Sequence, residues 1–309
     1  MKSKHVYLLI LLAVAASASA VTTYNTAWRG PAYDPVNNTQ NWFTASNWQY
    51  GVPTIQSDYA TSGKFGVTTY HGTGSTNYDT DLISCPIIAN DDARAVEVRV
   101  GGQAVTVVNY TTAYLQMDSG TLKTMNFLTL GCNTGAGDRA GIFYMHGGTA
   151  TLGGATADGL DNGSRATGHL YVGNGNTSAG WGKLFMDGGI IDVGGNFTIG
   201  NNLTDGEAYL SGDALIMANG FSMRPNSANV NNPYLDVSGQ AKIIVNGDVT
   251  TNVATYIGNG WLTAEGGESL LQYQYYKSGQ FAGKTVIGVP EPATVCLLGL
   301  GVLGLIRRK

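Results

Sequence analysis

A repeated pattern of alternating apolar residues on either side of a glycine-containing turn constrains the fold of this 309-residue chain more than any other feature. The pattern appears in "YLQMDSGTLKTM", "IFYMHGGTATLGG", "KLFMDGGIIDVGG", "AYLSGDALIMANG", "YLDVSGQAKIIVNG" and "WLTAEGGESLLQ". A unit this short cannot bury its apolar side chains until a neighbouring unit stacks on it. The pattern therefore predicts a solenoid.

The copies align on the apolar residue two positions before the turn glycine or its equivalent, and successive copies are 28, 41, 24, 27 and 27 residues apart. Side chains alternate between the two sides of a strand, so Met186 should lie on the same side as Leu184, with Asp187 at an outward turn. We expect an inward apolar stack through four coils. The equivalent positions are Met117, Met145, Met186, Leu210, Val237 and Ala264, the first four of which form this stack.

A second signature recurs between these copies, in "FLTLGCNTGAG", "HLYVGNGNTSAG", "FTIGNNLTDG" and "TYIGNG". Each predicts a strand that ends before a glycine and is followed by an Asn-rich turn. The high content of glycine, 44 residues, and the low content of charged residues, 12%, also favour short strands over helices. We predict an all-β chain whose residues 96–270 form about seven coils of a right-handed parallel β-helix. The signature glycines are Gly131, Gly173, Gly200 and Gly258.

The 41-residue step contains an insertion, "GGATADGLDNGSRATG", at residues 153–168. Its composition predicts a loop that bulges from one coil. Asp158, Asp161 and Asn162 offer oxygen ligands of the kind that Ca²⁺ prefers. Their spacing matches neither the EF-hand loop nor the G-G-x-G-x-D repeat, so a solvated loop is favoured over a calcium site.

Residues 21–95 differ in composition and are locally rich in aromatic residues. The segment "NWFTASNWQYGVP" contains Trp42, Phe43, Trp48 and Tyr50. The succession N-W, G-x-P, D-x-A resembles the N-terminal region of autotransporter-like β-helix surface proteins. This resemblance implies an irregular, aromatic-rich cap over the open end of the solenoid, where core and strand edge would otherwise be exposed. The alternative is a sugar-stacking aromatic platform, and the cap is favoured.

The N-terminus predicts export. Lys2 and Lys4 precede an apolar run, and Ala18 and Ala20 stand as in an A-x-A cleavage site. These are the three parts of a secretory signal peptide. We expect signal peptidase to remove residues 1–20.

The C-terminus combines Val289-Pro290-Glu291-Pro292, an uncharged run from 293 to 306, and three terminal cations. As a helix this run would be about 21 Å long, shorter than the roughly 30 Å hydrocarbon core of a bilayer. The cations fit the cytoplasmic side of a membrane. Residues 271–288 would then be the end of the solenoid and a linker, and residues 289–309 a hydrophobic sorting segment. The cations are Arg307, Arg308 and Lys309.

This three-part terminus resembles the PEP-CTERM sorting signal of Gram-negative bacteria. The resemblance implies transient anchoring in the inner membrane and processing near the Pro-Glu-Pro triplet by an exosortase, a membrane-embedded cysteine transpeptidase. It also implies delivery to the surface of a cell that makes exopolysaccharide.

Charge and cysteine content exclude several classes of partner. Without the two ends, 17 basic residues fall to 12 and 21 acidic residues to 20, which leaves a net charge of −8 and disfavours nucleic acid. Cys85 and Cys132 could form one disulfide or remain buried thiols, and the sequence leaves both open. They cannot supply a four-ligand zinc site, and we predict no cofactor.

Catalytic signals are weak. His146 stands at a turn where sister repeats have Asp118 or Asp187, which indicates a solvated residue, and a stack of Asp118, Asp187 and Asp192 along one face would be ordinary in a coil. We therefore predict a non-catalytic surface or matrix protein associated with exopolysaccharide. The alternative is a carbohydrate-active β-helix enzyme, a polysaccharide lyase or hydrolase, that uses the same sorting route.

Overall fold

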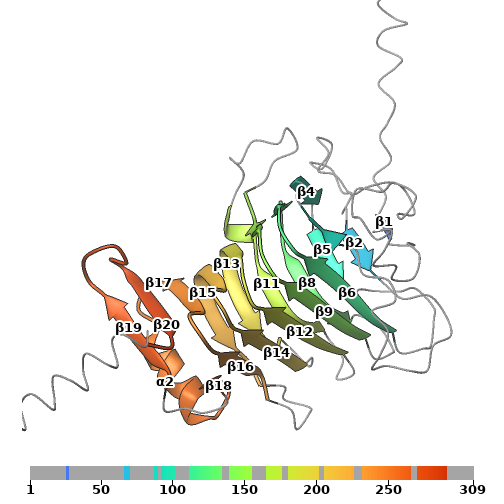
Figure 1. Cartoon of the computed structure of the whole chain (residues 1–309). Coiled ribbons are helices and arrows are strands. Elements are labelled where there is room, and N and C mark those ends of the chain that lie inside the picture. The colour runs from blue at the N-terminus through green and yellow to red at the C-terminus, as the bar shows by residue number, and fades with distance from the viewer. Residues whose placement is uncertain are drawn as a thin grey trace, which may run out of the picture.

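The computed structural model forms a β-solenoid of about five turns within the residues that it describes, with its strands stacked side by side along one axis (Figure 1). The described residues are 26–27, 66–69, 87–89, 92–95, 97–101, 111–133, 139–154, 165–175, 180–201, 205–225, 232–265 and 270–290.

The first face of the solenoid is a parallel sheet with seven strands in the described residues. Met186 pairs with Met145 on one side and with Leu210 on the other, and each of these three side chains is at most 1% exposed. The aligned inward row continues to Met117, Val237 and Ala264, so the register and the inward stack predicted from the repeats are confirmed. The strands are β3 (Ile87–Ile88), β6 (Thr111–Met117), β9 (Arg139–Met145), β12 (Gly180–Met186), β14 (Asp205–Leu210), β16 (Tyr234–Val237) and β18 (Leu262–Ala264).

The second and third faces belong to one larger sheet, because β13 (Ile190–Ile199) and β15 (Leu215–Met223) each run around the corner between them. A register shift between Val193 and Asn196 marks this corner. The second face contains β4 (Asp92–Ala95), β7 (Thr121–Thr124), β10 (Thr149–Leu152), the first halves of β13 and β15, and β17 (Lys242–Asn246). The third face contains β1 (Thr26–Ala27), β2 (Gly66–Thr69), β5 (Glu97–Val100), β8 (Leu128–Asn133), β11 (Leu170–Gly175) and the second halves of β13 and β15.

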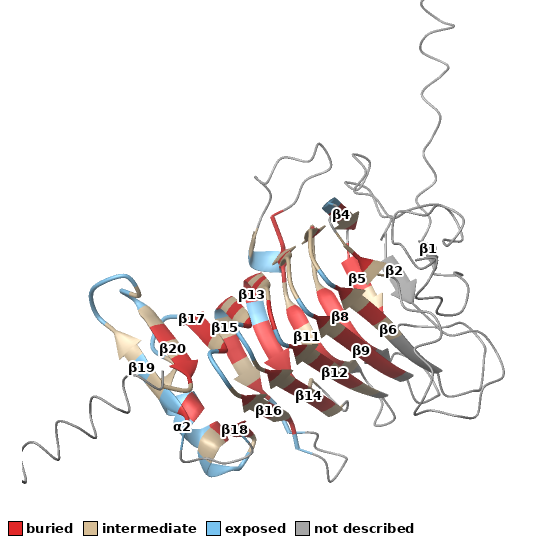
Figure 2. Ribbon diagram, viewed as in Figure 1, coloured by how far each residue is buried: buried red, intermediate tan, exposed pale blue. Residues whose placement is uncertain are grey.

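The core lies between the three faces and runs the length of the solenoid. Buried positions alternate with partly exposed ones along the strands (Figure 2). Phe143 and Phe197 are among the largest side chains that are fully buried.

The coil count differs from the predicted seven. The first face has seven strands in the described part of the chain, but the third face is built from strands only as far as β15. The next coil closes through helix α2 (Thr250–Gly258), so the strand predicted at "TYIGNG" is wrong. Tyr256 of this helix is buried and packs edge-on against Phe221 of the last complete coil, with ring centroids 5.6 Å apart.

An antiparallel hairpin covers the C-terminal end of the larger sheet. It consists of β19 (Gln272–Tyr276) and β20 (Lys284–Gly288), and β20 also pairs antiparallel with β17. Ile287 is fully buried, which joins the hairpin to the core. Residues 271–288 are therefore packed on the solenoid up to the start of the predicted sorting segment.

Strands β1 to β4 lie within residues 21–95, and β2 continues the third face beyond β5. Parallel stacking thus begins inside the region predicted to be a cap. Trp42, Phe43, Trp48 and Tyr50 lie outside the described residues, and their role as a cap stays a prediction.

The signature glycines allow a close approach between the third and first faces. Gly131 and Gly173 have positive φ, 66° and 78°, and a Cβ on either would collide with the backbone of Trp181 or Asp205. The Asn-rich turn that follows is tied between coils, because Asn201 Nδ2 donates to Asn174 Oδ1 at 2.8 Å. Gly258, in contrast, has no atom within 4 Å of its hypothetical Cβ.

Candidate functional site

The outward side of the first face carries a ladder of aromatic rings. Tyr144, Phe185 and Tyr209 occupy one row on β9, β12 and β14, immediately before the inward row. The centroids of Phe185 and Tyr144 are 5.2 Å apart, those of Phe185 and Tyr209 are 5.1 Å apart, and the planes are within 14° of parallel. All three side chains are half-buried, so part of each ring remains accessible. We call the outward side of β6, β9, β12, β14 and β16 the ladder face.

Two further tyrosines extend the ladder at its ends. Tyr114 stacks on Tyr144 at 6.5 Å, and Tyr234 lies 5.7 Å from Tyr209 with its plane tilted by 55°. The three central rings follow the spacing of adjacent strands, about 4.8 Å, because each comes from the next coil. Tyr114 and Tyr234 lie two residues earlier in register, opposite Ile142 and Glu207, so the aromatic strip across five strands of the described residues is parallel to the solenoid axis in its middle three rings.

Carboxylates lie beside the rings, on the side nearer the N-terminal ends of the strands. Glu207 accepts a hydrogen bond from the Tyr209 hydroxyl at 2.8 Å and pairs with Lys183 Nζ at 3.0 Å. Burial raises the pKa of Tyr209, and the hydrogen bond to Glu207 and the charge of that carboxylate raise it further. Tyr209 therefore remains a neutral hydroxyl donor at physiological pH. Lys183 also lies over the Trp181 ring, 5.2 Å from its centroid.

Asp236 continues the row of rings on the next strand, where it pairs with Tyr209 in register. Its carboxylate accepts from the Thr263 hydroxyl at 2.6 Å, and Thr263 also lies within 3.0 Å of the Tyr234 hydroxyl. This end of the ladder face is thus a connected set of hydroxyls and carboxylates.

The turn row, immediately after the inward row, borders the rings on the other side. It places Asp118, His146 and Asp187 in successive coils, as the backbone hydrogen bonds of these residues to the previous coil show. His146 Nδ1 lies 3.0 Å from both carboxylate oxygens of Asp187, and the His146 side chain is 46% exposed. The predicted solvated turn position of His146 is confirmed.

Asp192 does not belong to this row. The predicted stack of Asp118, Asp187 and Asp192 is therefore wrong for Asp192. The chain turns a corner after Asp187, and Asp192 lies on the second face in register with Thr151 and Met217. There it pairs with Arg165 at 2.5 Å. Arg165 belongs to the short 3₁₀ helix η3 (Arg165–Thr167), so this ion pair ties the C-terminal end of the insertion to the next coil.

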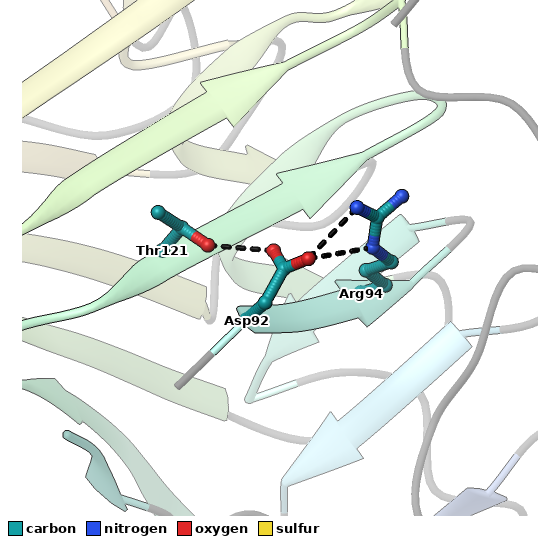
Figure 3. A network of polar contacts seen from close by, with 3 residues as sticks. All are labelled: Asp92, Arg94 and Thr121. Carbon is teal, nitrogen blue, oxygen red and sulfur yellow. Dashed lines mark hydrogen bonds and ion pairs between the residues drawn. The ribbon is translucent and has the colours of Figure 1, made fainter. Parts of the chain in front are cut away.

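A separate polar network on the second face joins the first two coils (Figure 3). Asp92 accepts from Thr121 Oγ1 at 2.6 Å and from two nitrogens of Arg94 at 2.9 and 2.7 Å. Burial alone would raise the pKa of Asp92, but the hydrogen bonds from Thr121 and Arg94 together with the Arg94 charge hold it below its ordinary value. Asp92 thus links Arg94 of its own strand to Thr121 of the next coil, so this network stabilises the coils.

His169 is the histidine that follows the insertion. The backbone N–H of Asn196 donates to His169 Nδ1 at 2.9 Å, which requires that nitrogen to be unprotonated. Burial lowers the pKa of His169 and so favours the same neutral form. This histidine has a structural role between two coils.

Most of the other predicted site residues fall outside the described part of the chain. These are Ala18, Ala20, Asp158, Asp161, Glu291, Pro292, Arg307, Arg308 and Lys309, and also Cys85 and the side chain of Cys132. Val289 packs against the core beside β20, and Pro290 is half-buried. Within the residues that can be placed, no group of three or more His, Cys, Asp or Glu side chains could hold a metal ion.

In a comparison with known protein families, residues 288–309 match the PEP-CTERM protein-sorting motif. The chain ends in a PEP-CTERM motif. This motif implies processing by an exosortase and export to the cell surface. No curated protein and no solved structure is significantly similar to the chain. Among the described residues, helices of the length and apolar character needed to cross a membrane are absent.

Proposed function

We propose that the exported body is a non-catalytic matrix protein that holds exopolysaccharide on its ladder face. The observation that carries this proposal is the row of Tyr144, Phe185 and Tyr209, which are half-buried on an outward sheet surface. The rings stack on one another, so their outward edges are the accessible part, and Tyr144 and Tyr209 add a hydroxyl to this apolar edge. The C–H groups of a sugar ring can pack on these edges while its hydroxyls bond to the tyrosine hydroxyls.

The direction of the ladder supports a polymeric ligand. The rings repeat from coil to coil along the solenoid axis, so an extended polysaccharide lying on the ladder face would meet equivalent contacts at successive sugars. Several weak contacts on one chain act together, since each further contact is intramolecular once the first has formed. A rigid solenoid holds these contacts at fixed spacing and therefore limits the ordering cost of binding.

The geometry of the carboxylates favours binding over cleavage. Glycoside hydrolysis requires two carboxyl groups that flank the scissile bond from opposite sides. Glu207 and Asp236 instead project from neighbouring strands of one sheet surface, and each is hydrogen-bonded to side chains of that surface. The polysaccharide lyase or hydrolase thus has less support than the binding protein.

The proposed delivery route begins with removal of residues 1–20 by signal peptidase. The apolar run from 293 to 306 then anchors the body transiently in the inner membrane of a Gram-negative cell. Exosortase processing at the sorting motif releases the body to the surface, where it meets the exopolysaccharide.

Incubation of the processed, exported protein with exopolysaccharide from the producing organism tests this proposal. We expect the protein to co-sediment with the polymer while the size distribution of the polymer stays unchanged. Shortened oligosaccharides in the supernatant would establish the enzyme instead, and protein that stays fully soluble beside the polymer would contradict the binding role.

A further inference from the structure

We propose that the ladder face selects polysaccharides that carry free amino groups over neutral and acidic ones. This inference rests on the proposed function, because it assigns a chemical class to the polymer held on that same surface. It follows from the charges that surround the rings.

The ladder face is strongly acidic. Its described side chains include one lysine, Lys183, which is already paired with Glu207 at 3.0 Å. His146 is the other basic group among the described side chains of this face, and it lies against Asp187. The carboxylates of the same surface are Asp118, Asp187, Asp205, Glu207 and Asp236. A polymer with carboxylate or sulfate groups would meet like charges along the whole strip.

The carboxylates lie on both sides of the rings rather than in one cluster. Asp187 follows Phe185 by two residues, and Glu207 precedes Tyr209 by two residues, so both project to the same side of the sheet as the rings. The distance between neighbouring rows is shown by Tyr144 and His146, whose ring centroids are 6.5 Å apart. A substituent on a sugar that lies along the rings can therefore reach a carboxylate on either side.

An ammonium group gains a charge interaction in this position. It can donate a charge-assisted hydrogen bond to Asp187 or Glu207, each of which is partly exposed and has lone pairs beyond those used by its present partners. An N-acetylated sugar keeps the contacts with the rings but loses the charge, so it should bind more weakly.

Titration calorimetry with matched oligosaccharides tests this inference on the processed protein. The probes are a glucosamine hexamer, the N-acetylglucosamine hexamer with the same linkage, and an alginate hexamer. We expect the glucosamine hexamer to bind at least about tenfold more tightly than its N-acetylated counterpart. Its affinity should fall with added salt, and the alginate hexamer should show no binding.

A double variant with Asp187→Asn and Glu207→Gln keeps the rings and the side-chain shapes but removes two charges. We expect its preference for the glucosamine hexamer to fall to about threefold or less, while the affinity for the N-acetylated hexamer changes little. Asp248→Asn is the matched control, because Asp248 is exposed and lies between β17 and α2, which are not part of the ladder face. This control should keep the full preference.

Equal affinity for the two hexosamine hexamers, or binding of alginate, would overturn the inference. If the exopolysaccharide of the producer still co-sediments in that case, the proposed function stands and only the chemical class is wrong. If the amine preference holds but that exopolysaccharide is not retained, the selectivity of the ladder face stands and the proposed function fails.

Discussion

Replacement of Met186 by Asp tests the inward row on which the solenoid depends. Met186 is 1% exposed and lies between Met145 and Leu210 in the core. Loss of its apolar burial costs about 1.5–3 kcal/mol, and an unpaired buried carboxylate adds several kcal/mol. The sum, about 5 kcal/mol or more, is comparable with the whole stability of many domains.

The damage should spread beyond one coil, because β12 pairs with β9 on one side and β14 on the other. We expect new protease cleavage within residues 180–215 and a lower unfolding temperature. Two control substitutions accompany this experiment. Asp187→Asn, at an exposed turn, should change the free energy of unfolding by less than about 0.5 kcal/mol. Met186→Leu, which keeps the side chain apolar, should lower it by less than about 1.5 kcal/mol. If Met186→Asp resists protease as well as Asp187→Asn, the inward assignment is refuted.

Three further predictions follow from named residues. Gly173→Ala should lower the free energy of unfolding, measured in urea, by about 1–3 kcal/mol or more, because the residue has positive φ and a Cβ would collide with the Asp205 backbone. The control Gly258→Ala should be neutral or stabilising. Equal effects of the two substitutions would contradict the close approach of the coils. The pKa of His169 is below its ordinary value of 6.5 in the folded protein, so the unfolded state binds more protons, and stability should fall as the pH drops through 6.5 and then through the lowered pKa. The unfolding temperature should depend less on pH in His169→Gln. An unchanged pH dependence of the unfolding temperature in that variant would contradict the neutral, hydrogen-bonded form. The mass of protein released from the cell surface should lack the segment from Ala293 to Lys309, and a full-length C-terminus would rule out processing.

The strand register of the first face could be predicted from the sequence. Side chains in a strand alternate with a period of two, and a shift by one residue would move Met145 and Met186 from the core to solvent. The apolar position before each turn therefore identified the pairing of six strands, which the structure confirms.

Helix α2 could not be predicted in the same way. "TYIGNG" has the alternation of a short strand, and a run of this length does not separate strand from helix. Packing decides the outcome, because Tyr256 and Val253 bury one side of the helix against the last complete coil. The prediction for Asp192 failed for a related reason, since the corner after Asp187 leads to another face.

The aromatic ladder could have been predicted from the repeats. It was missed because the repeats were aligned on the inward, core-facing position and not on the position before it. The residue immediately before the inward position is Tyr144, Phe185 and Tyr209 in three successive copies. An outward position has no core-packing requirement, and aromatic residues on successive strands stack on one another there, which also stabilises the sheet. The flanking residues Gln116 and Asp236 show that this run is confined to the middle of the solenoid.

Binding of the producer's exopolysaccharide to a ladder variant tests the central claim most directly. The variant carries Tyr144→Ala, Phe185→Ala and Tyr209→Ala, and Tyr171→Ala on the third face is the control, with an intact fold of each verified by thermal unfolding. Aromatic contacts of about 0.5–1.5 kcal/mol each correspond to a loss of affinity of roughly tenfold to a hundredfold or more for three rings. We expect that loss in the ladder variant and unchanged binding in Tyr171→Ala. A folded ladder variant that binds as tightly as the unmodified protein would contradict the account.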